Sequence, residues 1–421
     1  MGFMRKSASQ MFAVILAIGA ITTGSLGQSD LLDTKVKNEV VDSVSTLLSD
    51  RAFVPGIDFK KWSDFLNQEK SQIDTAKSDD DFQKAINAAL QKFGASHVML
   101  MTPRLARIRR TGSTVGIGIS TLPVADGLSV VRVVPSAPAD KAGIQAGDVI
   151  TQVDGKPITN TQGITGEVGT EVLIKAKHQD GKIQDYKLIR QKYSTVREPE
   201  LNWVNKETAQ IKIYSFDTGY ERSQVGDLFT QAQSAKNIIL DLRFNGGGAV
   251  TNVQHLLGFF IPDTKAIGTF IRRSNVDAYV LATRGKPNDL AAIAQWTENK
   301  FRPVHRSDLP LFNGHVAVLV NRFSASASEI AAAALHDTLG APIIGTKSAG
   351  AVLASIIVPA SNGFMLQYPI QDYVTSKGVR LEGNGVVPDF EVKEPIASPK
   401  GAPDEAIEKA CSVLAHTKSV K

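Results

Sequence analysis

The chain has little cysteine, no large excess of charge and no long apolar run after its first residues, and each shortage excludes a class of protein. One cysteine, Cys411, in 421 residues cannot form an internal disulfide, so this is not a disulfide-stapled domain. The net charge is +5, and it falls to +3 without residues 1–27, which hold Arg5 and Lys6 but no acid. So small an excess does not favour nucleic acid as a partner.

The longest apolar run lies near the start of the chain, at 11–21. It is short for a membrane-spanning helix, it follows Arg5 and Lys6, and it precedes the small residues Ser25 and Gly27. This order predicts a secretory signal peptide over residues 1–27, with an uncleaved membrane anchor as the alternative. We therefore expect export to the periplasm or the extracellular space, and no stable membrane insertion after cleavage.

The rest of the chain changes character twice. Residues 28–110 carry apolar side chains at helical spacing and predict a helical region. It closes with the basic run 104–110, which has no interleaved aromatic residues and is interpreted as a solvated linker. Short β-type runs separated by Gly and Asp turns fill residues 111–195. Residues 196–395 alternate strands and helices, which predicts an α/β core, and a polar tail with one short helix follows at 396–421. The strands expected in the core are Ile211–Tyr214, Ile238–Leu242, Val316–Val320 and Pro342–Ile344, with helices at Val250–Phe260 and Ser328–His336.

The β-rich segment 111–195 resembles a PDZ domain of bacterial proteases. The resemblance rests on the run SAPADKAGIQAGDVITQVDGKPI, on a preceding strand at Leu128–Val134 and on the earlier run VGIGI. A PDZ domain binds an extended peptide as an added strand, and the glycine-containing loop would offer backbone N–H groups to a terminal carboxylate. The alternative is that these glycines only shape a turn. The residues expected to bind peptide are Gly116, Ile117, Gly118 and Ile119.

Two turns in the core join a strand to a helix and carry residues suited to catalysis. The first, DLRFNGGG at 241–248, aims backbone N–H groups at an anion but lacks the ending of a phosphate loop. The second, NRFSASASEI at 321–330, places serines where helix N–H groups point outward. Together with GNGVVPD at 383–389, the two runs are similar to those of the tail-specific (C-terminal processing) serine peptidases. The resemblance covers roughly residues 90–395.

The resemblance implies a crotonase-like α/β spiral core and a nucleophile at the middle serine, Ser326. The overall expectation is thus a multidomain α+β and α/β protein with a helical N-terminal part, a PDZ domain and this protease core. Ser324 and Ser328 are expected to cap the start of the helix. Helix capping is also the alternative to a nucleophilic role for Ser326. The oxyanion would be stabilised by N–H groups of Ala327 and Gly247, with Gly246 as the alternative to Gly247.

The chain departs from most members of that family at the general base. Those members carry a lysine 25 residues after the serine, and here that place holds Ala351, with Lys347 nearby. A subset of the family, including tricorn-like members, uses a histidine. The residues in matching places are His97 as base, Ser96 beside it and Glu382 late in the core. His97 as an ordinary helix-end histidine is the alternative.

These expectations give two hypotheses for function. The first is an exported serine endopeptidase that acts on polypeptides, chiefly unfolded or tail-bearing proteins, and needs no cofactor or metal, because the sequence has no ligand cluster at metal spacing. The second is a catalytically inactive relative that binds polypeptides or a hydrophobic ligand. The missing lysine motivates the second, and the intact serine and glycine runs argue against it.

Overall fold

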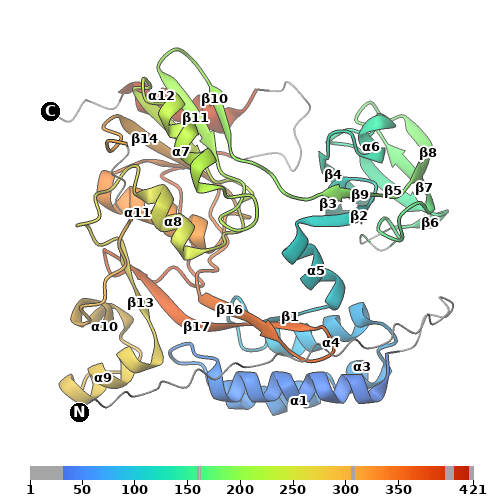
Figure 1. The fold of residues 1–421 in the computed structure, drawn as a ribbon, viewed down its shortest axis with the longest axis horizontal. Helices are drawn as coiled ribbons and strands as arrows, with labels where there is room; N and C mark the ends of the chain where they lie inside the picture. Colours follow the sequence, from blue (N-terminus) through green and yellow to red (C-terminus); the bar gives the residue numbers. More distant parts are fainter. Residues whose placement is uncertain (1–31, 159–160, 162, 305–308, 394–402, 417–421) are drawn as a thin grey trace, which may run out of the picture.

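The fold was examined in a computed structural model, which describes residues 32–158, 161, 163–304, 309–393 and 403–416. The predicted signal peptide therefore lies outside the described residues. Three parts of the chain follow one another along Figure 1: a helical layer, a β-rich unit that stands to one side, and a larger α/β core.

The N-terminal helices form because apolar residues recur every four positions behind clear helix starts. In α1 (Thr34–Arg51), Asp33 caps the first turn, and Val40, Val44 and Leu48 are fully buried. In α4 (Asp79–Gln91), Ser78 accepts a hydrogen bond from the third residue of the helix. The other elements of this layer are η1 (Phe59–Lys61), α2 (Trp62–Gln68) and α3 (Lys70–Thr75).

Two elements near the end of the predicted helical region differ from expectation. Residues Met99–Met101 form a strand, β1, which pairs antiparallel with β17 (Met365–Thr375). The basic run is a helix, α5 (Pro103–Thr111), rather than a linker. Thr102 caps it, Pro103 occupies its first position, and Gly112 ends it in the left-handed region at φ 58°.

The β-rich unit is built on one antiparallel sheet in the order β3-β4-β5-β7-β8, with β6 paired to β5. The strand β2 pairs instead with β9, so that the two ends of the unit leave side by side. The predicted strand Leu128–Val134 is β4, within one residue at each end. The bounds are β2 (Ser113–Gly116), β3 (Ile119–Val124), β4 (Gly127–Val133), α6 (Pro138–Lys141), β5 (Val149–Val153), β6 (Lys156–Pro157), β7 (Glu171–Lys177), β8 (Ile183–Ile189) and β9 (Gln191–Ser194).

The α/β core is centred on a six-stranded sheet in the order β10-β11-β12-β14-β15-β18. All its neighbours are parallel except β10 and β11, and the central strands are continuous apolar runs because both faces are covered. The expected strands and helices are present with shifted ends. The bounds are β10 (Glu200–Trp203), β11 (Thr208–Lys212), α7 (Arg222–Gln231), β12 (Asn237–Asp241), α8 (Val250–Leu257), β14 (His315–Val320), α11 (Ala327–Leu339), β15 (Ile343–Gly345) and β18 (Phe390–Glu391).

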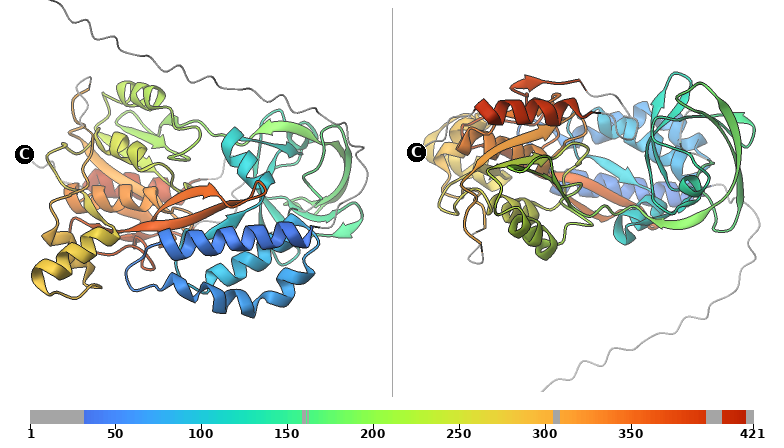
Figure 2. Two further views of the ribbon diagram at one scale, coloured as in Figure 1. Left: turned by 60° about the horizontal axis from the view of Figure 1, so that its bottom comes forward. Right: turned by 90° about the horizontal axis from the view of Figure 1, so that it is seen from above.

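The predicted tail is part of this core. Its helix, α12 (Glu405–His416), packs Ala406, Ala410 and Leu414 against the face of the sheet formed by residues such as Leu319. Figure 2 shows α12 lying across the sheet on its outer side. The helix is held at its start by Asp404, which pairs with the buried Arg243. The tail is therefore a structural layer.

A second, smaller sheet joins the core to the N-terminal helices. Its order is β1-β17-β13, with β16 on β17, and one face packs on α1 and α4 through Leu100, Leu366 and Tyr368. Figures 1 and 2 show the long hairpin of β16 and β17 reaching from the core across these helices. The bounds are β13 (Gly268–Ile271), α9 (Arg273–Thr283), α10 (Leu290–Trp296) and β16 (Ala354–Pro359). No helix among the described residues is long and apolar enough to cross a bilayer.

Candidate active site

The serine run lies on the turn between β14 and α11, and its middle serine has a strained backbone. Ser326 has φ 56° and ψ −117°, a conformation that a residue with a side chain rarely adopts. Ser324 and Ser328 are fully buried, and their hydroxyls donate to the backbone carbonyls of Leu242 and Asn245 at 2.9 and 2.8 Å. These two serines tie the turn to the neighbouring strand end, and neither caps the helix as expected. Ser326 is the only one of the three that is partly exposed.

The glycine turn after β12 packs directly against Ser326. A Cβ atom on Gly247 would lie 2.7 Å from the Ser326 Cβ and 2.8 Å from the Ala325 carbonyl oxygen, and φ is +97° there. On Gly248 it would lie 2.3 Å from the Phe216 carbonyl carbon. The close approach of the two turns therefore requires glycine at both positions.

Some backbone N–H groups of these turns have a hydrogen-bond acceptor and others do not. Gly247 N donates to the Oδ1 of the buried Asn245 at 2.9 Å. The N–H groups of Gly246 and Ala327 have no acceptor among the described residues. The geometry thus leaves Ala327 and the alternative glycine, Gly246, available to an oxyanion, and a role for Gly247 would require its bond to Asn245 to break.

A buried carboxylate that the sequence analysis did not single out supports the serine turn. Glu329, on the first turn of α11, is fully buried and accepts hydrogen bonds from Ser326 N at 2.9 Å and from Gly350 N and Ala351 N at 2.7 and 2.9 Å. The Ser348 hydroxyl donates to it as well, at 2.5 Å. Burial raises the pKa of Glu329, and these four donors oppose that shift. The Ser-x-x-Glu spacing of a capping box was the sequence signal for it.

The predicted histidine, serine and glutamate are joined by hydrogen bonds. His97 Nδ1 and Ser96 Oγ are 2.7 Å apart, and Ser96 Oγ and Glu382 Oε2 are 2.8 Å apart. The single hydroxyl proton goes to the carboxylate, so His97 Nδ1–H donates to Ser96 Oγ and Nε2 carries no proton in the neutral ring. Ser96 N also donates to Glu382 Oε1 at 2.8 Å. The structure thus brings Ser96 and His97 into contact with Glu382, which lies 286 positions after Ser96.

Three consecutive amides connect this group to the serine turn. Gly350 N and Ala351 N donate to Glu329, which holds Ser326, and the next amide, Val352 N, donates to Glu382 Oε2 at 2.8 Å. The segment that follows β15 therefore contacts the supports of both Ser326 and His97. Ala351, the place of the missing lysine, lies within it, whereas Lys347 is exposed.

The electrostatic surroundings keep His97 neutral. Burial lowers the pKa of His97, and the charge of Arg109 lowers it further, while the nearby Glu382 carboxylate raises it. The net direction is downward, so the imidazole is unprotonated at neutral pH and able to accept a proton. His97 also has a positive φ of 59°, a second strained backbone position at the site.

The loop predicted to bind peptide lies at the start of β3, an edge strand of its sheet. The Ile117 side chain is fully buried in the core of this unit, and the carbonyls of Ile117 and Gly118 accept from Ala139 N and Val134 N. Gly118 has φ +82° and no room for a Cβ, which would lie 2.1 Å from the Ala137 Cβ. A peptide can therefore meet the backbone of this loop, the partly exposed Ile119 side chain and the open edge of β3. The described residues contain no group of three or more His, Cys, Asp or Glu side chains that could hold a metal ion.

Comparisons with known proteins match two parts of the chain. Residues 207–392 match the model of peptidase family S41, and residues 129–172 match a PDZ domain. A carboxy-terminal-processing protease from Bartonella bacilliformis is 27% identical over 80% of this chain and 75% of its own length. A probable CtpA-like serine protease from Staphylococcus epidermidis is 26% identical over 68% of this chain. The match spans 54% of that relative, so the chain covers about half its length.

Solved structures share the fold. A photosystem II D1 C-terminal processing protease aligns over 91% of this chain and 98% of its own, with a TM-score of 0.52 and 21% identity. The mature CPAF complexed with lactacystin aligns over 91% and 98%, with a TM-score of 0.54 and 13% identity. The predicted resemblance is confirmed: residues 207–392 match peptidase family S41, and a match to a PDZ domain at 129–172 precedes them.

Proposed function

We propose that this chain is an exported serine endopeptidase in which Ser326 is the nucleophile, His97 the general base, and Ser96 and Glu382 the groups that orient the base. The observation that carries the proposal is the chain of hydrogen bonds from Ser326 N to Glu329, from the adjacent amides of Ala351 and Val352 to Glu329 and Glu382, and from Glu382 through Ser96 Oγ to His97. It supports a site in which serine and histidine are held relative to each other without a lysine.

In the proposed reaction, Ser326 Oγ attacks a peptide carbonyl carbon while His97 Nε2 takes the hydroxyl proton. His97 then gives that proton to the leaving amine, and water hydrolyses the acyl-enzyme by the same steps in reverse. The bond from His97 Nδ1–H to Ser96 Oγ fixes the tautomer, and the Glu382 carboxylate stabilises the transient imidazolium through that hydroxyl. The free N–H groups of Ala327 and Gly246 stabilise the tetrahedral oxyanion.

The PDZ domain is proposed to capture a polypeptide tail of the substrate. The support is the open edge of β3, to which an extended peptide can be added, and the glycine-containing loop at 116–119 beside it. Export is proposed from residues 1–27, whose basic start and short apolar run are typical of a signal peptide.

A fluorophosphonate probe and a casein-cleavage assay test the proposal together. Wild type is expected to be labelled and active, Ser326→Ala to be neither, and His97→Ala to lose turnover by orders of magnitude. Lys347→Ala is the matched control and should stay close to wild type, because Lys347 is exposed.

The missing lysine favours one other function, that of an inactive polypeptide-binding relative. An absence of labelling and of cleavage in the folded wild type would establish it. If Lys347→Ala lost activity and His97→Ala kept it, the general base would be Lys347 and not His97.

A further inference from the structure

A cleft of about 970 Å³ lies between α5, the 217–218 loop and the small sheet. Its size suits a segment of polypeptide. Figure 1 shows α5 above the end of the β16–β17 hairpin. The basic helix that the sequence analysis interpreted as a linker thus forms one wall of a cleft.

The floor of the cleft is a mostly apolar face of the small sheet. Cross-strand register puts Met101, Met365 and Pro359 in one row, and Met99, Gln367 and Ile357 in the next row. The opposite face of the same strands packs on the N-terminal helices. Methionine side chains adapt to apolar groups of different shape, so this floor suits an apolar side chain without demanding one particular residue.

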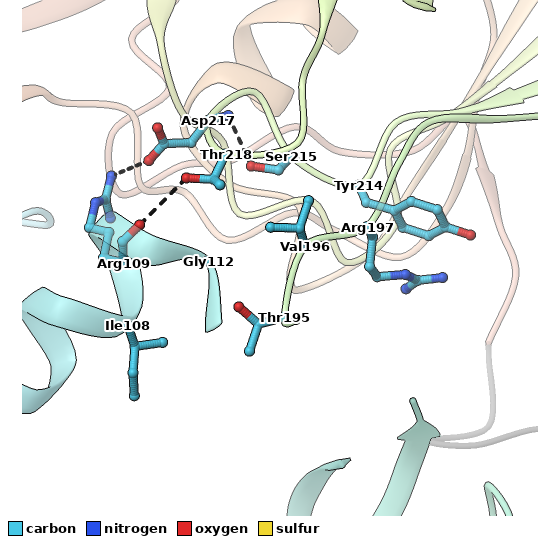
Figure 3. A pocket seen from close by; sticks show the side chains of 10 residues that line it. All are labelled: Ile108, Arg109, Gly112, Thr195, Val196, Arg197, Tyr214, Ser215, Asp217 and Thr218. Carbon is cyan, nitrogen blue, oxygen red and sulfur yellow. Dashed lines mark hydrogen bonds and ion pairs between the residues drawn. The ribbon is translucent and has the colours of Figure 1, made fainter. Parts of the chain in front are cut away.

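The wall of the cleft is positively charged. Arg107, Arg109 and Arg110 line it against a single acid, Asp217. Arg109 pairs with Asp217 at 2.7 Å, as Figure 3 shows, and so its charge is matched. Arg107 and Arg110 are exposed and form no ion pair within the described part of the chain. The cleft therefore combines an apolar floor with two unmatched cations.

One wall residue of the cleft, Arg109, is close enough to His97 for its charge to act on that histidine. Met101 is the last residue of β1, which starts two residues after His97. Asp217 follows Phe216, whose N–H donates to the Gly247 carbonyl at 2.8 Å, and Gly247 contacts Ser326. The loop that lines the cleft is thus in contact with the glycine turn that packs on Ser326.

From this geometry we propose that the cleft is a substrate site for an extended polypeptide segment that combines an apolar side chain, seated on Met101, Met365 and Ile357, with a carboxylate held by Arg107 and Arg110. The proposal rests on the proposed peptidase function and adds its substrate class. An acidic side chain and a chain terminus offer the same carboxylate, and the test separates them.

Binding to the full-length Ser326→Ala protein is measured by fluorescence anisotropy with labelled decapeptides that have amidated C-termini. One peptide has a central Leu-Val pair flanked by two glutamates, a second has lysines in place of the glutamates, and a third has serines in place of the apolar pair. A fourth is the lysine peptide with a free C-terminal carboxylate. The protein variants are Arg107→Glu with Arg110→Glu, Met365→Gln, and Arg104→Glu as control. Arg104 is on the same helix outside this cleft, in an exposed pair with Asp80.

The acidic peptide is expected to bind most tightly and to lose about tenfold in affinity with the double variant, since each of the two exposed charge pairs contributes up to about fivefold. The loss should shrink at high salt, and Arg104→Glu should bind like the parent. Met365→Gln should remove the preference for the peptide with the apolar pair over the one with serines. If the free-acid lysine peptide binds as tightly as the acidic one and also fails with the double variant, the carboxylate is a chain terminus.

Equal affinities for acidic and amidated lysine peptides, or a double variant that binds like Arg104→Glu, would overturn the proposal. Because anisotropy measures binding and not cleavage, this result is independent of whether Ser326 is the nucleophile, which the fluorophosphonate labelling of wild type reports.

Discussion

Replacing Glu382 by glutamine tests the proposed orientation of His97 most directly. Two hydrogen bonds, of 2.8 and 2.7 Å, share Ser96 Oγ, so the carboxylate oxygen lies within about 5.5 Å of His97 Nδ1. At that separation, two unit charges attract by about 3 kcal/mol at an effective dielectric constant of about 20, and by about 0.8 kcal/mol in water. Glu382→Gln removes this attraction from the imidazolium that forms during attack. We expect kcat to fall by about 4-fold to about 150-fold.

The pH profile separates this electrostatic effect from a structural one. The base acts when His97 is neutral, so activity rises with pH through the pKa of His97, and burial already lowers that pKa. The Glu382 charge raises it, and its removal therefore moves the acidic limb of kcat/KM to lower pH. Ser96→Ala is the control: it breaks the hydrogen-bond relay but keeps the carboxylate, so turnover should fall with a smaller movement of the limb.

The assay is initial-rate cleavage of a fluorogenic peptide between pH 4.5 and 9, with the folding of each variant checked by circular dichroism. An acidic limb that stays in place or moves to higher pH in Glu382→Gln would refute the reasoning, whatever the change in kcat.

Three further substitutions or deletions have distinct expected results. Gly247→Ala should reduce turnover by more than about a hundredfold, because the new Cβ would lie 2.7 Å from the Ser326 Cβ. Gly246→Ala is the control and should keep most activity, because no atom lies within 4 Å of its new Cβ. Equal losses in the two variants would contradict this. Ser324→Ala should lower the free energy of unfolding in urea by about 1–3 kcal/mol, since it removes the two buried hydrogen bonds of the hydroxyl, to the Leu242 carbonyl and from the Asn321 amide. Ser326→Ala should change it by less than about 0.5 kcal/mol. Deleting residues 111–195, whose two ends are joined by a hydrogen bond of 2.9 Å from Thr195 N to the Gly112 carbonyl, should raise KM for long unfolded proteins more than for short peptides. Unchanged capture of long substrates would argue against the PDZ role.

The sequence was sufficient for features that depend on local patterns. The glycine turn and the serine turn could be located because each joins an apolar strand to a helix, and the PDZ domain because its motifs occur in a fixed order. His97, Ser96 and Glu382 were paired only through the family resemblance, since no local rule relates residues 286 positions apart. The structure places them in hydrogen-bond contact, and their catalytic roles stay predictions.

Other features depend on tertiary packing and could not be read from the chain. The sequence pattern around Glu329 is an ordinary helix start and does not predict a role at the site. Its role follows from the hydrogen bonds that the amides of residues 350–351 donate to it. The basic run was misread because arginines are typical of both an exposed linker and a helix with one wet face. The final helix has the polar composition of a tail, and the burial of Ala410 follows only from its packing on the core sheet.

The distance along the chain between Ser96 and Glu382 has a consequence for when the proposed enzyme becomes active. The imidazole of His97 is near the start of the folded part, and its carboxylate partner is near the end. A chain that is made and exported from its N-terminus thus carries its histidine and its serine before the glutamate that completes the relay arrives. The proposed peptidase therefore reaches its full rate only after residue 382 has been made and has folded against Ser96.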